Sequence, residues 1–192
     1  MSPNQIHVLG ICGSPRRGGN TETLIDEVLR GAQQAGAVVD KVLLGELDIA
    51  PCDACNACEA KGECVYDDDM PPLLDRMARS QVWVLGTPVY WWGPSAQFKL
   101  FLDRWYSKVF RPEDQAIFKG RQVVVVVPMG DPDPATARHT VGMLTDALRY
   151  SQANLLATVL ATDVNDPGEV RRQAAVMAAA RQAGRDAVAA CS

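Results

Sequence analysis

Five consecutive valines, Val123–Val127, constrain the fold of this 192-residue chain more than any other feature. β-Branched residues favour extended backbone, and an unbroken valine run offers no polar face to water. A strand that is buried on both faces is typical of the centre of a parallel sheet, where helices cover both sides. The valine run therefore predicts an α/β protein built around a parallel sheet.

The rest of the chain alternates between strand and helix patterns. We expect four further strands, at residues 6–9, 38–44, 82–86 and 154–162. Helical spacing of apolar residues recurs between them, and we expect a last helix from about Pro167 whose inward-facing residues are Val170, Ala174, Met177 and Ala178. Strands that alternate with helices predict a doubly wound α/β sheet, with no linker or internal repeat.

A glycine-rich turn at residues 10–23 separates the first strand from the first helix, with the sequence Gly-Ile-Cys-Gly-Ser-Pro-Arg-Arg-Gly-Gly-Asn-Thr-Glu-Thr. Such a turn directs backbone N–H groups and the positive end of a helix at one point, which suits a phosphate. Short polar side chains and positive charge add to it, at Ser14, Asn20, Thr21 and Thr23 and at Arg16 or Arg17. The turn predicts a phosphate-bearing cofactor.

The turn lacks the Gly-Lys-Ser/Thr of an ATP-type P-loop and is not Gly-x-Gly-x-x-Gly. Without the lysine and the Mg²⁺-binding hydroxyl, hydrolysis of a nucleoside triphosphate is not expected. A single phosphate monoester fits better. The alternative is that residues 18–20 form only a flexible turn.

Ligands of doubly wound sheets lie beyond the carboxyl ends of the strands, so the loops at residues 12–20, 88–94 and 129–134 should converge on one crevice. Tyr90, Trp91 and Trp92 offer flat apolar surface there. Prolines at 88 and 94 stiffen the surrounding backbone. A planar ring attached to a phosphate would use both ends of this crevice; alternatively, the tryptophans belong to a subunit interface or to the core.

Three motifs in this order carry a resemblance: Gly-Ser-Pro-Arg-Arg-Gly-Gly-Asn-Thr, then Pro-Val-Tyr, then Lys99-x-x-x-Asp103-Arg104. Together they resemble the flavodoxin-like NAD(P)H-dependent FMN oxidoreductases, best over residues 6–106. The resemblance implies a three-layer fold with a five-stranded parallel sheet in the order 2-1-3-4-5. Residues 1–192 would then form a single FMN-binding domain with a cysteine-rich insertion at 48–69.

The same resemblance implies where FMN binds. Its phosphate would contact Ser14, Arg16, Asn20 and Thr21, with Thr23 as a further candidate, and its isoalloxazine would lie against Pro88, Val89, Tyr90, Trp91 and Trp92. Relatives often have a glycine-rich turn after the fourth strand, whereas this chain offers Gly130 and Asp131 as flavin contacts. NAD(P)H is the implied hydride donor. Hydride transfer needs geometry and exclusion of water more than an acid or base, so we assign no catalytic residue.

Four cysteines within thirteen residues form the second chemical feature, in the spacing Cys52-x2-Cys55-x2-Cys58-x5-Cys64. Four thiolates suit a [4Fe-4S] cluster or a Zn²⁺ ion, and free or redox-active thiols are the other possibility. Gly62 would relieve the bend before the last cysteine. The spacing resembles the iron-sulfur flavoproteins of the same family, in which the cluster of one protomer approaches the flavin of a neighbour. That implies a homodimer or homotetramer, with the helices that bear Phe98, Trp105 or Tyr150 as candidate contact surfaces.

The function that we expect is FMN-dependent NAD(P)H oxidoreduction, in which electrons pass through the flavin, and through the cluster if one is present, to an acceptor. Three alternatives stay open: a cluster-free NAD(P)H:quinone or FMN reductase, a flavodoxin-like electron carrier without an NAD(P)H site, and a zinc-stabilised interaction module.

Charge and hydropathy limit the classes of binding partner and the cellular location that we expect. A net charge of −4 gives no reason to expect nucleic acid or an anionic membrane surface. We see no apolar run of membrane-spanning length and no secretion signal, so we expect a cytoplasmic protein whose cysteines stay reduced. The acidic run at residues 67–69 is interpreted as solvated charge at a helix N-terminus rather than as a cation site.

Overall fold

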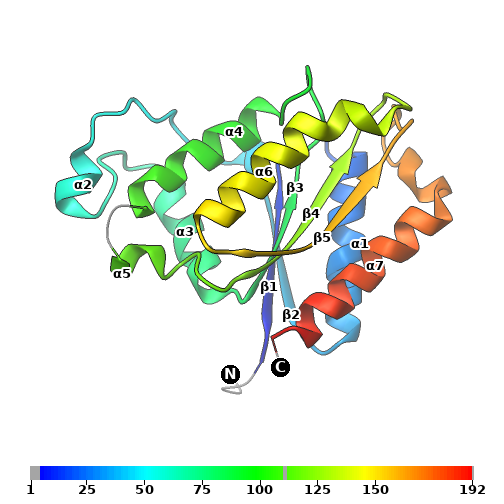
Figure 1. The fold of residues 1–192 in the computed structure, drawn as a ribbon, viewed down its shortest axis with the longest axis horizontal. Helices are drawn as coiled ribbons and strands as arrows, with labels where there is room; N and C mark the ends of the chain where they lie inside the picture. Colours follow the sequence, from blue (N-terminus) through cyan, green and yellow to red (C-terminus); the bar gives the residue numbers. More distant parts are fainter. Residues whose placement is uncertain (1–4, 110–111, 192) are drawn as a thin grey trace.

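The computed structural model describes residues 5–109 and 112–191 (Figure 1). Five parallel strands form one sheet in the order β2-β1-β3-β4-β5. Their bounds are β1 His7–Cys12, β2 Val38–Leu43, β3 Val82–Gly86, β4 Gln122–Pro128 and β5 Asn154–Ala161. The predicted doubly wound α/β sheet and its strand order are confirmed.

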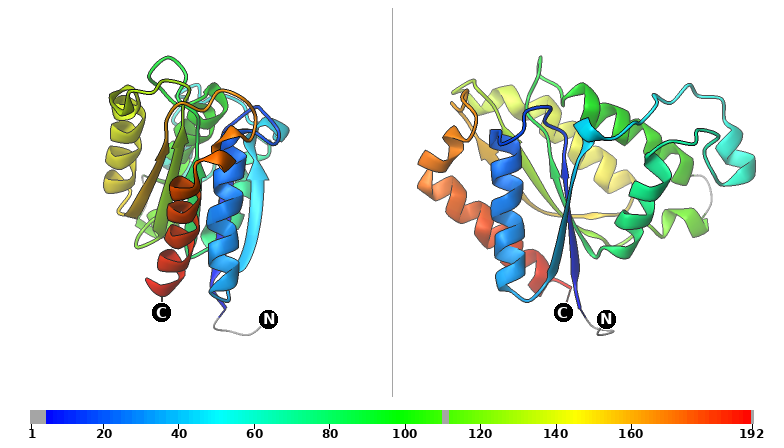
Figure 2. Two further views of the ribbon diagram at one scale, coloured as in Figure 1. Left: turned by 90° about the vertical axis from the view of Figure 1, so that its right-hand side faces the viewer. Right: turned by 180° about the vertical axis from the view of Figure 1, so that it is seen from behind.

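Helices cover both faces of the sheet, which gives three layers (Figure 2). One face carries α1 (Asn20–Gln34) and α7 (Ala174–Ala189), and the other carries α3 (Met70–Arg79), α4 (Ala96–Asp103) and α6 (Arg138–Tyr150). The shorter helical segments are η1 Leu44–Glu46, α2 Ala57–Lys61, η2 Arg104–Lys108, α5 Pro112–Gln115, η3 Pro134–Ala137 and η4 Glu169–Arg172. Within the described ranges, no helix is both long enough and apolar enough to cross a membrane.

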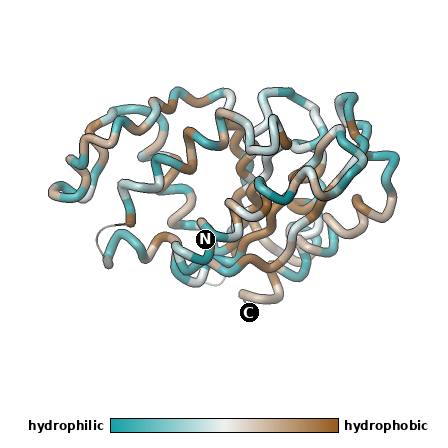
Figure 3. The backbone as a smooth tube through the Cα atoms, turned by 45° about the horizontal axis from the view of Figure 1, so that its top comes forward, coloured by the Kyte–Doolittle hydropathy of each residue, from teal (hydrophilic) through white to brown (hydrophobic). Residues whose placement is uncertain are grey.

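The valine run forms β4 and divides its side chains between two cores. Val123, Val125 and Val127 pack on the side of α3, α4 and α6, whereas Val124 and Val126 pack on the side of α1 and α7. All five are at most 1% exposed. In Figure 3 hydrophobic residues accordingly gather along the central strands. The sequence pattern and the burial agree because a central strand has no solvent-facing side.

Close contact between α1 and α7 determines which face of α7 is buried. A Cβ on Gly184 would lie 1.9 Å from the carbonyl oxygen of Val28, so only glycine permits this approach. The buried face consists of Ala180, Ala183, Gly184, Ala187 and Val188. The expected inward face was partly wrong: Ala174 and Ala178 are exposed, and Val170 is buried but belongs to η4. A helix made mostly of alanine has little contrast between its faces, so its apolar pattern is a weak guide.

Two of the three residues named on the candidate contact helices are buried inside the protomer. Phe98 is fully buried and Trp105 is 5% exposed, and both rings pack edge-on against Phe101 in the core. Only Tyr150, at 75% exposure, remains available on the surface.

Candidate functional site

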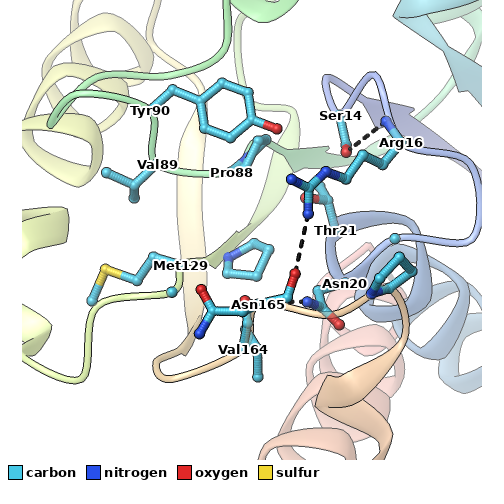
Figure 4. Close-up of a pocket in the computed structure, with 14 residues that line it drawn as sticks. Ser14, Arg16, Asn20, Thr21, Pro88, Val89, Tyr90, Met129, Val164 and Asn165 are labelled. Atoms are coloured by element: carbon cyan, nitrogen blue, oxygen red, sulfur yellow. Dashed lines mark hydrogen bonds between the residues drawn. The ribbon is translucent and has the colours of Figure 1, made fainter.

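A cavity of about 350 Å³ lies at the carboxyl ends of β1, β3 and β4. Its lining comes from four loops, and the residues are Ser14, Arg16, Gly19, Asn20, Thr21, Pro88, Val89, Tyr90, Pro128, Met129, Gly130, Val164, Asn165 and Pro167. Figure 4 shows Tyr90 and Val89 facing Arg16 across this space, with Asn165 below them. The expected convergence of three loops is therefore present, together with a fourth loop after β5 that the sequence did not reveal.

The glycine-rich turn is held in shape by its own residues. Gly18 has a φ of +65°, which glycine tolerates, and its N–H donates to Glu22 at 2.7 Å. Glu22 also accepts from Lys41 of β2 at 2.7 Å. Burial raises the pKa of Glu22, but the bonds from Lys41 and Gly18 outweigh it and hold that pKa below its ordinary value. The first turn of α1, whose N–H groups have no intrahelical acceptors, thereby faces the cavity in a rigid frame.

Asn20 links this turn to the fourth loop. Its Nδ2 donates to the carbonyl oxygens of Val164 at 3.3 Å and Asp166 at 3.0 Å, and its Oδ1 accepts the N–H of Val170 at 3.1 Å. Arg16 Nη1 adds a bond of 3.1 Å to the carbonyl oxygen of Asn165. These bonds attach the fourth loop to the glycine-rich turn and the start of α1, although the bonded residues are 144 and 149 positions apart in the sequence. No local sequence motif predicts such a contact.

The aromatic loop forms a tight turn at the rim of the cavity. Tyr90 and Gly93 exchange two backbone hydrogen bonds of 2.8 and 3.0 Å, and the residues between them, Trp91 and Trp92, have φ of +50° and +61°. Two positive φ values define a turn that normally uses asparagine and glycine, so two tryptophans here store strain. Thr140 Oγ1 donates to the Trp92 carbonyl oxygen at 3.2 Å and helps hold it.

The structure does not bring every candidate residue to the cavity. Eight line it: Ser14, Arg16, Asn20, Thr21, Pro88, Val89, Tyr90 and Gly130. Four lie outside the lining: Thr23, Trp91, Trp92 and Asp131. Thr23 is 5% exposed within the core, and its Oγ1 has no hydrogen-bond partner among the described residues. Trp91 is 91% exposed, so it lies beyond the rim rather than in the core.

Gly130 and Asp131 play different parts in the turn after β4. A Cβ on Gly130 would lie 2.1 Å from Asn165 Oδ1, so glycine makes room for that amide. Asp131 instead caps its own turn, because it accepts from Asp133 N–H at 2.8 Å and from Thr136 Oγ1 at 2.9 Å. Those two bonds lower the pKa of Asp131.

Cys12, at the start of the glycine-rich turn, has its pKa raised by burial to about 11 and stays protonated.

The four clustered cysteines line a second, much smaller pocket of about 20 Å³. Positive φ values at Ala54, Asn56 and Gly62 turn the chain so that Cys52, Cys55, Cys58 and Cys64 face one space. Burial, followed by the charge of the neighbouring thiols, raises the pKa of Cys58. In the described part of the chain, no three His, Cys, Asp or Glu side chains are already spaced to hold one metal ion.

Arg104 and Asp68 form a buried ion pair beside these cysteines. Arg104 is 2% exposed, its Nη1 and Nη2 bond the two oxygens of Asp68, and its Nη2 also contacts Cys64 Sγ at 3.3 Å. The side chain of Asp68 is only 7% exposed. The interpretation of residues 67–69 as solvated charge was therefore wrong for Asp68, because an arginine far along the sequence buries it. Burial raises the pKa of Asp68, but the bonds from Arg104 and from the N–H groups of Met70 and Ala50 together outweigh it, and the net shift is downward.

Comparison with known protein families decides the classification. A family model described as NADPH-dependent FMN reductase matches residues 6–164. The chain belongs to this family.

Individual relatives of this FMN reductase family member fall into two groups. An iron-sulfur flavoprotein of Archaeoglobus fulgidus is 37% identical over 125 residues, which are 65% of the chain and 56% of the relative. The putative NAD(P)H-dependent FMN-containing oxidoreductase YwqN of Bacillus subtilis is 25% identical over 174 residues, 88% of the chain and 92% of that protein. The chain spans about half the length of the iron-sulfur flavoproteins that it matches.

Solved structures agree with the family at the level of the fold. The NAD(P)H:quinone oxidoreductase from Methanothermobacter marburgensis superposes with a TM-score of 0.74 at 19% identity, covering 95% of this chain and 96% of that one. At this identity the likeness shows the fold alone. The expected flavodoxin-like fold and the expected family are both confirmed.

Proposed function

We propose that the protein is an FMN-dependent oxidoreductase that takes electrons from NAD(P)H. The observation that carries this proposal is the cavity, which joins a phosphate-type turn at one end to Tyr90 at the other. Membership of the NADPH-dependent FMN reductase family supports the same cofactor and donor.

The cavity residues suggest distinct contributions to FMN binding. N–H groups at the start of α1, with the hydroxyls of Ser14 and Thr21 and the guanidinium of Arg16, would bind the phosphate. Asn20 would act differently, since its amide is used to hold residues 164–170 against the turn. Pro88, Val89 and Tyr90 would support the ring, and Gly130 lines the same cavity with the Asn165 amide packed against it.

FMN, when bound, supplies the redox chemistry of the reaction, and the protein positions it and excludes water. Among the described residues that line the cavity there is no His, Cys, Asp or Glu. A site without an acid or base suits hydride transfer, which requires alignment more than proton transfer. Tyr90 and the exposed Trp91 would provide the flat surface against which a nicotinamide ring packs.

Anaerobic mixing with NADH or NADPH tests this function. The FMN-loaded protein should lose its flavin absorbance within one turnover, and Ser14→Ala with Thr21→Val should lower FMN affinity by at least about tenfold. Ser151→Ala, at the C-terminal end of α6 and outside the cavity lining, is the matched control. Bound flavin that neither nucleotide bleaches would favour the alternative electron carrier.

We propose further that Cys52, Cys55, Cys58 and Cys64 hold a [4Fe-4S] cluster. Their chemistry fits: four thiols share one pocket, and a buried arginine donates to one of the sulfurs. The names of the iron-sulfur flavoprotein relatives support the same assignment. The present pocket is small, so binding requires the loop to open around the group, as is common for metal sites that form with their metal.

Replacing Cys55 with serine tests the cluster directly. Anaerobically purified wild-type protein should show a broad iron-sulfur shoulder beside the flavin peaks, and Cys55→Ser should remove the shoulder while FMN stays bound. Cys191→Ser is the control, because Cys191 lies outside the cysteine pocket. A shoulder that survives Cys55→Ser would contradict the assignment, and stoichiometric zinc in place of iron would support the metal-stabilised alternative.

The positions of the two pockets support an oligomer. The FMN cavity and the cysteine pocket share no lining residue. In Figure 1 the cysteine segment with α2 lies at the left, whereas residues 164–170, which close the cavity, lie at the right. We therefore propose a homodimer or homotetramer in which the cysteines of one protomer approach the flavin of another. A single domain and a cytoplasmic location, where the six free thiols would stay reduced, belong to the same proposal.

A further inference from the structure

We propose that Arg104 is a positioning residue for the cluster ligand Cys64, and that its N–H···S hydrogen bond raises the reduction potential of the cluster. This inference rests on the proposed cluster and adds a residue to it. Nothing in the cysteine spacing itself points to an arginine forty residues away.

The guanidinium of Arg104 is fixed from several sides. Nη1 donates to the Ala50 carbonyl oxygen at 2.8 Å and to Asp68, and Nη2 donates to Asp68 at 3.2 Å. The ring of Tyr66 lies under it, with 5.2 Å between the guanidinium carbon and the ring centroid. With its plane held in this way, the remaining Nη2 donor is directed at Cys64 Sγ, 3.3 Å away.

A second observation connects Arg104 to the cysteine pocket. Its Nε is buried and has no hydrogen-bond partner among the described residues, although Arg104 lines that pocket. Buried charged donors are normally satisfied, because an unmade bond is costly. An arginine that served only to pair with Asp68 would not need to lie in the lining. Arg104 thus has one donor on a cysteine sulfur and a second, buried donor without a partner among the described residues.

The electrostatic consequence has a definite sign. A donor on a ligand sulfur stabilises the more negative, reduced state of the group that the sulfur binds. Removing it should therefore lower the reduction potential. Outer-shell partners of metal ligands commonly change properties tenfold or more. We expect a tenfold change in the ratio of reduced to oxidised protein at a given ambient potential, which corresponds to about 59 mV for one electron.

The decisive variant is the pair Arg104→Met with Asp68→Asn. It removes one positive and one negative charge together, so the net charge of the region is unchanged and any shift in potential reports the lost hydrogen bond. Arg104→Lys is measured in parallel, because lysine retains the charge but cannot bond Asp68, Ala50 and Cys64 at once. Lys108→Met is the matched control: Lys108 donates to Gly62 in the same segment at 3.2 Å and, within the described part of the chain, donates to no cysteine sulfur.

Iron content, FMN content and the midpoint potential of the cluster are measured on the holoprotein, the potential by an anaerobic titration followed by EPR. The midpoint potential should be lower than in the wild type for the double variant and for Arg104→Lys, and the change should be smaller for Lys108→Met. In D₂O, the coupling of an exchangeable deuteron to the reduced cluster should be seen in the wild type and should disappear in the double variant. Loss of iron with FMN retained also supports positioning of Cys64. Iron-loaded variants with unchanged potentials would overturn the role of Arg104 alone, whereas wild-type protein that takes up no iron would overturn the cluster itself.

Discussion

Asn20 illustrates at the scale of one residue how the structure adds a role to a motif. Its place in a glycine-rich turn suggests a phosphate ligand, yet its side chain makes three hydrogen bonds to residues 164–170. Asn20 also lines the cavity, so holding the loop is a role in addition to the predicted phosphate contact. A short polar residue before a helix is compatible with both uses, so the pattern alone does not separate them.

Asn20→Ala should release the fourth loop and lower FMN affinity by about tenfold or more, because three hydrogen bonds of about 1 kcal/mol each are lost. Hydrogen exchange should rise in residues 164–170 with little change in β4. Gln33→Ala, exposed on the same helix, is the control. An Asn20→Ala protein with unaltered exchange in that loop would refute the anchoring role.

Glu22 makes the turn sensitive to acid. Because its pKa is lowered in the folded protein, its stabilising bonds to Gly18 and Lys41 are fully present above its ordinary value of 4.5 and are lost as the pH falls through the lowered value. FMN should therefore dissociate more readily below pH 4.5 than the loss of phosphate charge explains. Glu22→Gln should flatten this dependence in a fluorescence titration of FMN release, and an identical pH profile in the variant would contradict it.

The Tyr90–Gly93 turn is the element in which local preference and tertiary structure disagree. Tryptophan at two positive-φ positions is unfavourable, and the turn persists because Tyr90, Gly93 and Thr140 hold its backbone. Strain of this kind commonly marks a functional position. The strain and the exposure of Trp91 together suggest that the side chains are kept for a contact outside the cavity.

Replacing Trp91 and Trp92 with asparagine and glycine should relieve that strain and stabilise the free protein by about 1–3 kcal/mol per position. The KM for NAD(P)H should rise at the same time, because the flat surface beside Tyr90 is lost. Thermal unfolding and steady-state kinetics measure the two effects. Trp91→Phe is the control, because it keeps an aromatic ring on the same backbone and should change neither the stability nor the KM strongly. A double variant that is more stable but has an unaltered KM would contradict a nicotinamide contact at this turn.

At the scale of the whole molecule, the separation of the two pockets predicts how electrons travel. Protein carrying Cys55→Ser retains flavin but no cluster, and protein carrying Ser14→Ala with Thr21→Val, stripped of FMN, retains the cluster but no flavin. Neither alone should transfer electrons from NADPH to the cluster. A mixture in which the two variants exchange subunits should restore the transfer, and the EPR signal of the reduced cluster should then appear. Mass measurement confirms that mixed oligomers have formed. If they have formed and no EPR signal appears, electron transfer between protomers is contradicted.

Local patterns were sufficient to predict the parallel sheet and much of the cavity at its carboxyl edge, whereas the strand order was predicted from the resemblance to a known family. Val123–Val127 reports burial on both faces directly, and residues 14–21 combine glycine, helix start and polar side chains in one continuous segment. These features depend on residues that are neighbours within one element, so they can be predicted from the sequence alone. The approach of loops at the carboxyl ends of parallel strands then follows from topology.

Only the tertiary structure decided the contacts between distant segments. Asn20 with residues 164–170, Arg104 with Cys64 and Asp68, and the buried face of α7 all depend on side chains that are far apart in sequence and meet after the layers pack. Where an element has one clearly apolar face, hydrophobic periodicity specifies which side is buried, but it does not specify which polar partner the element meets there. A buried charge requires its partner, and that partner can come from anywhere in the chain.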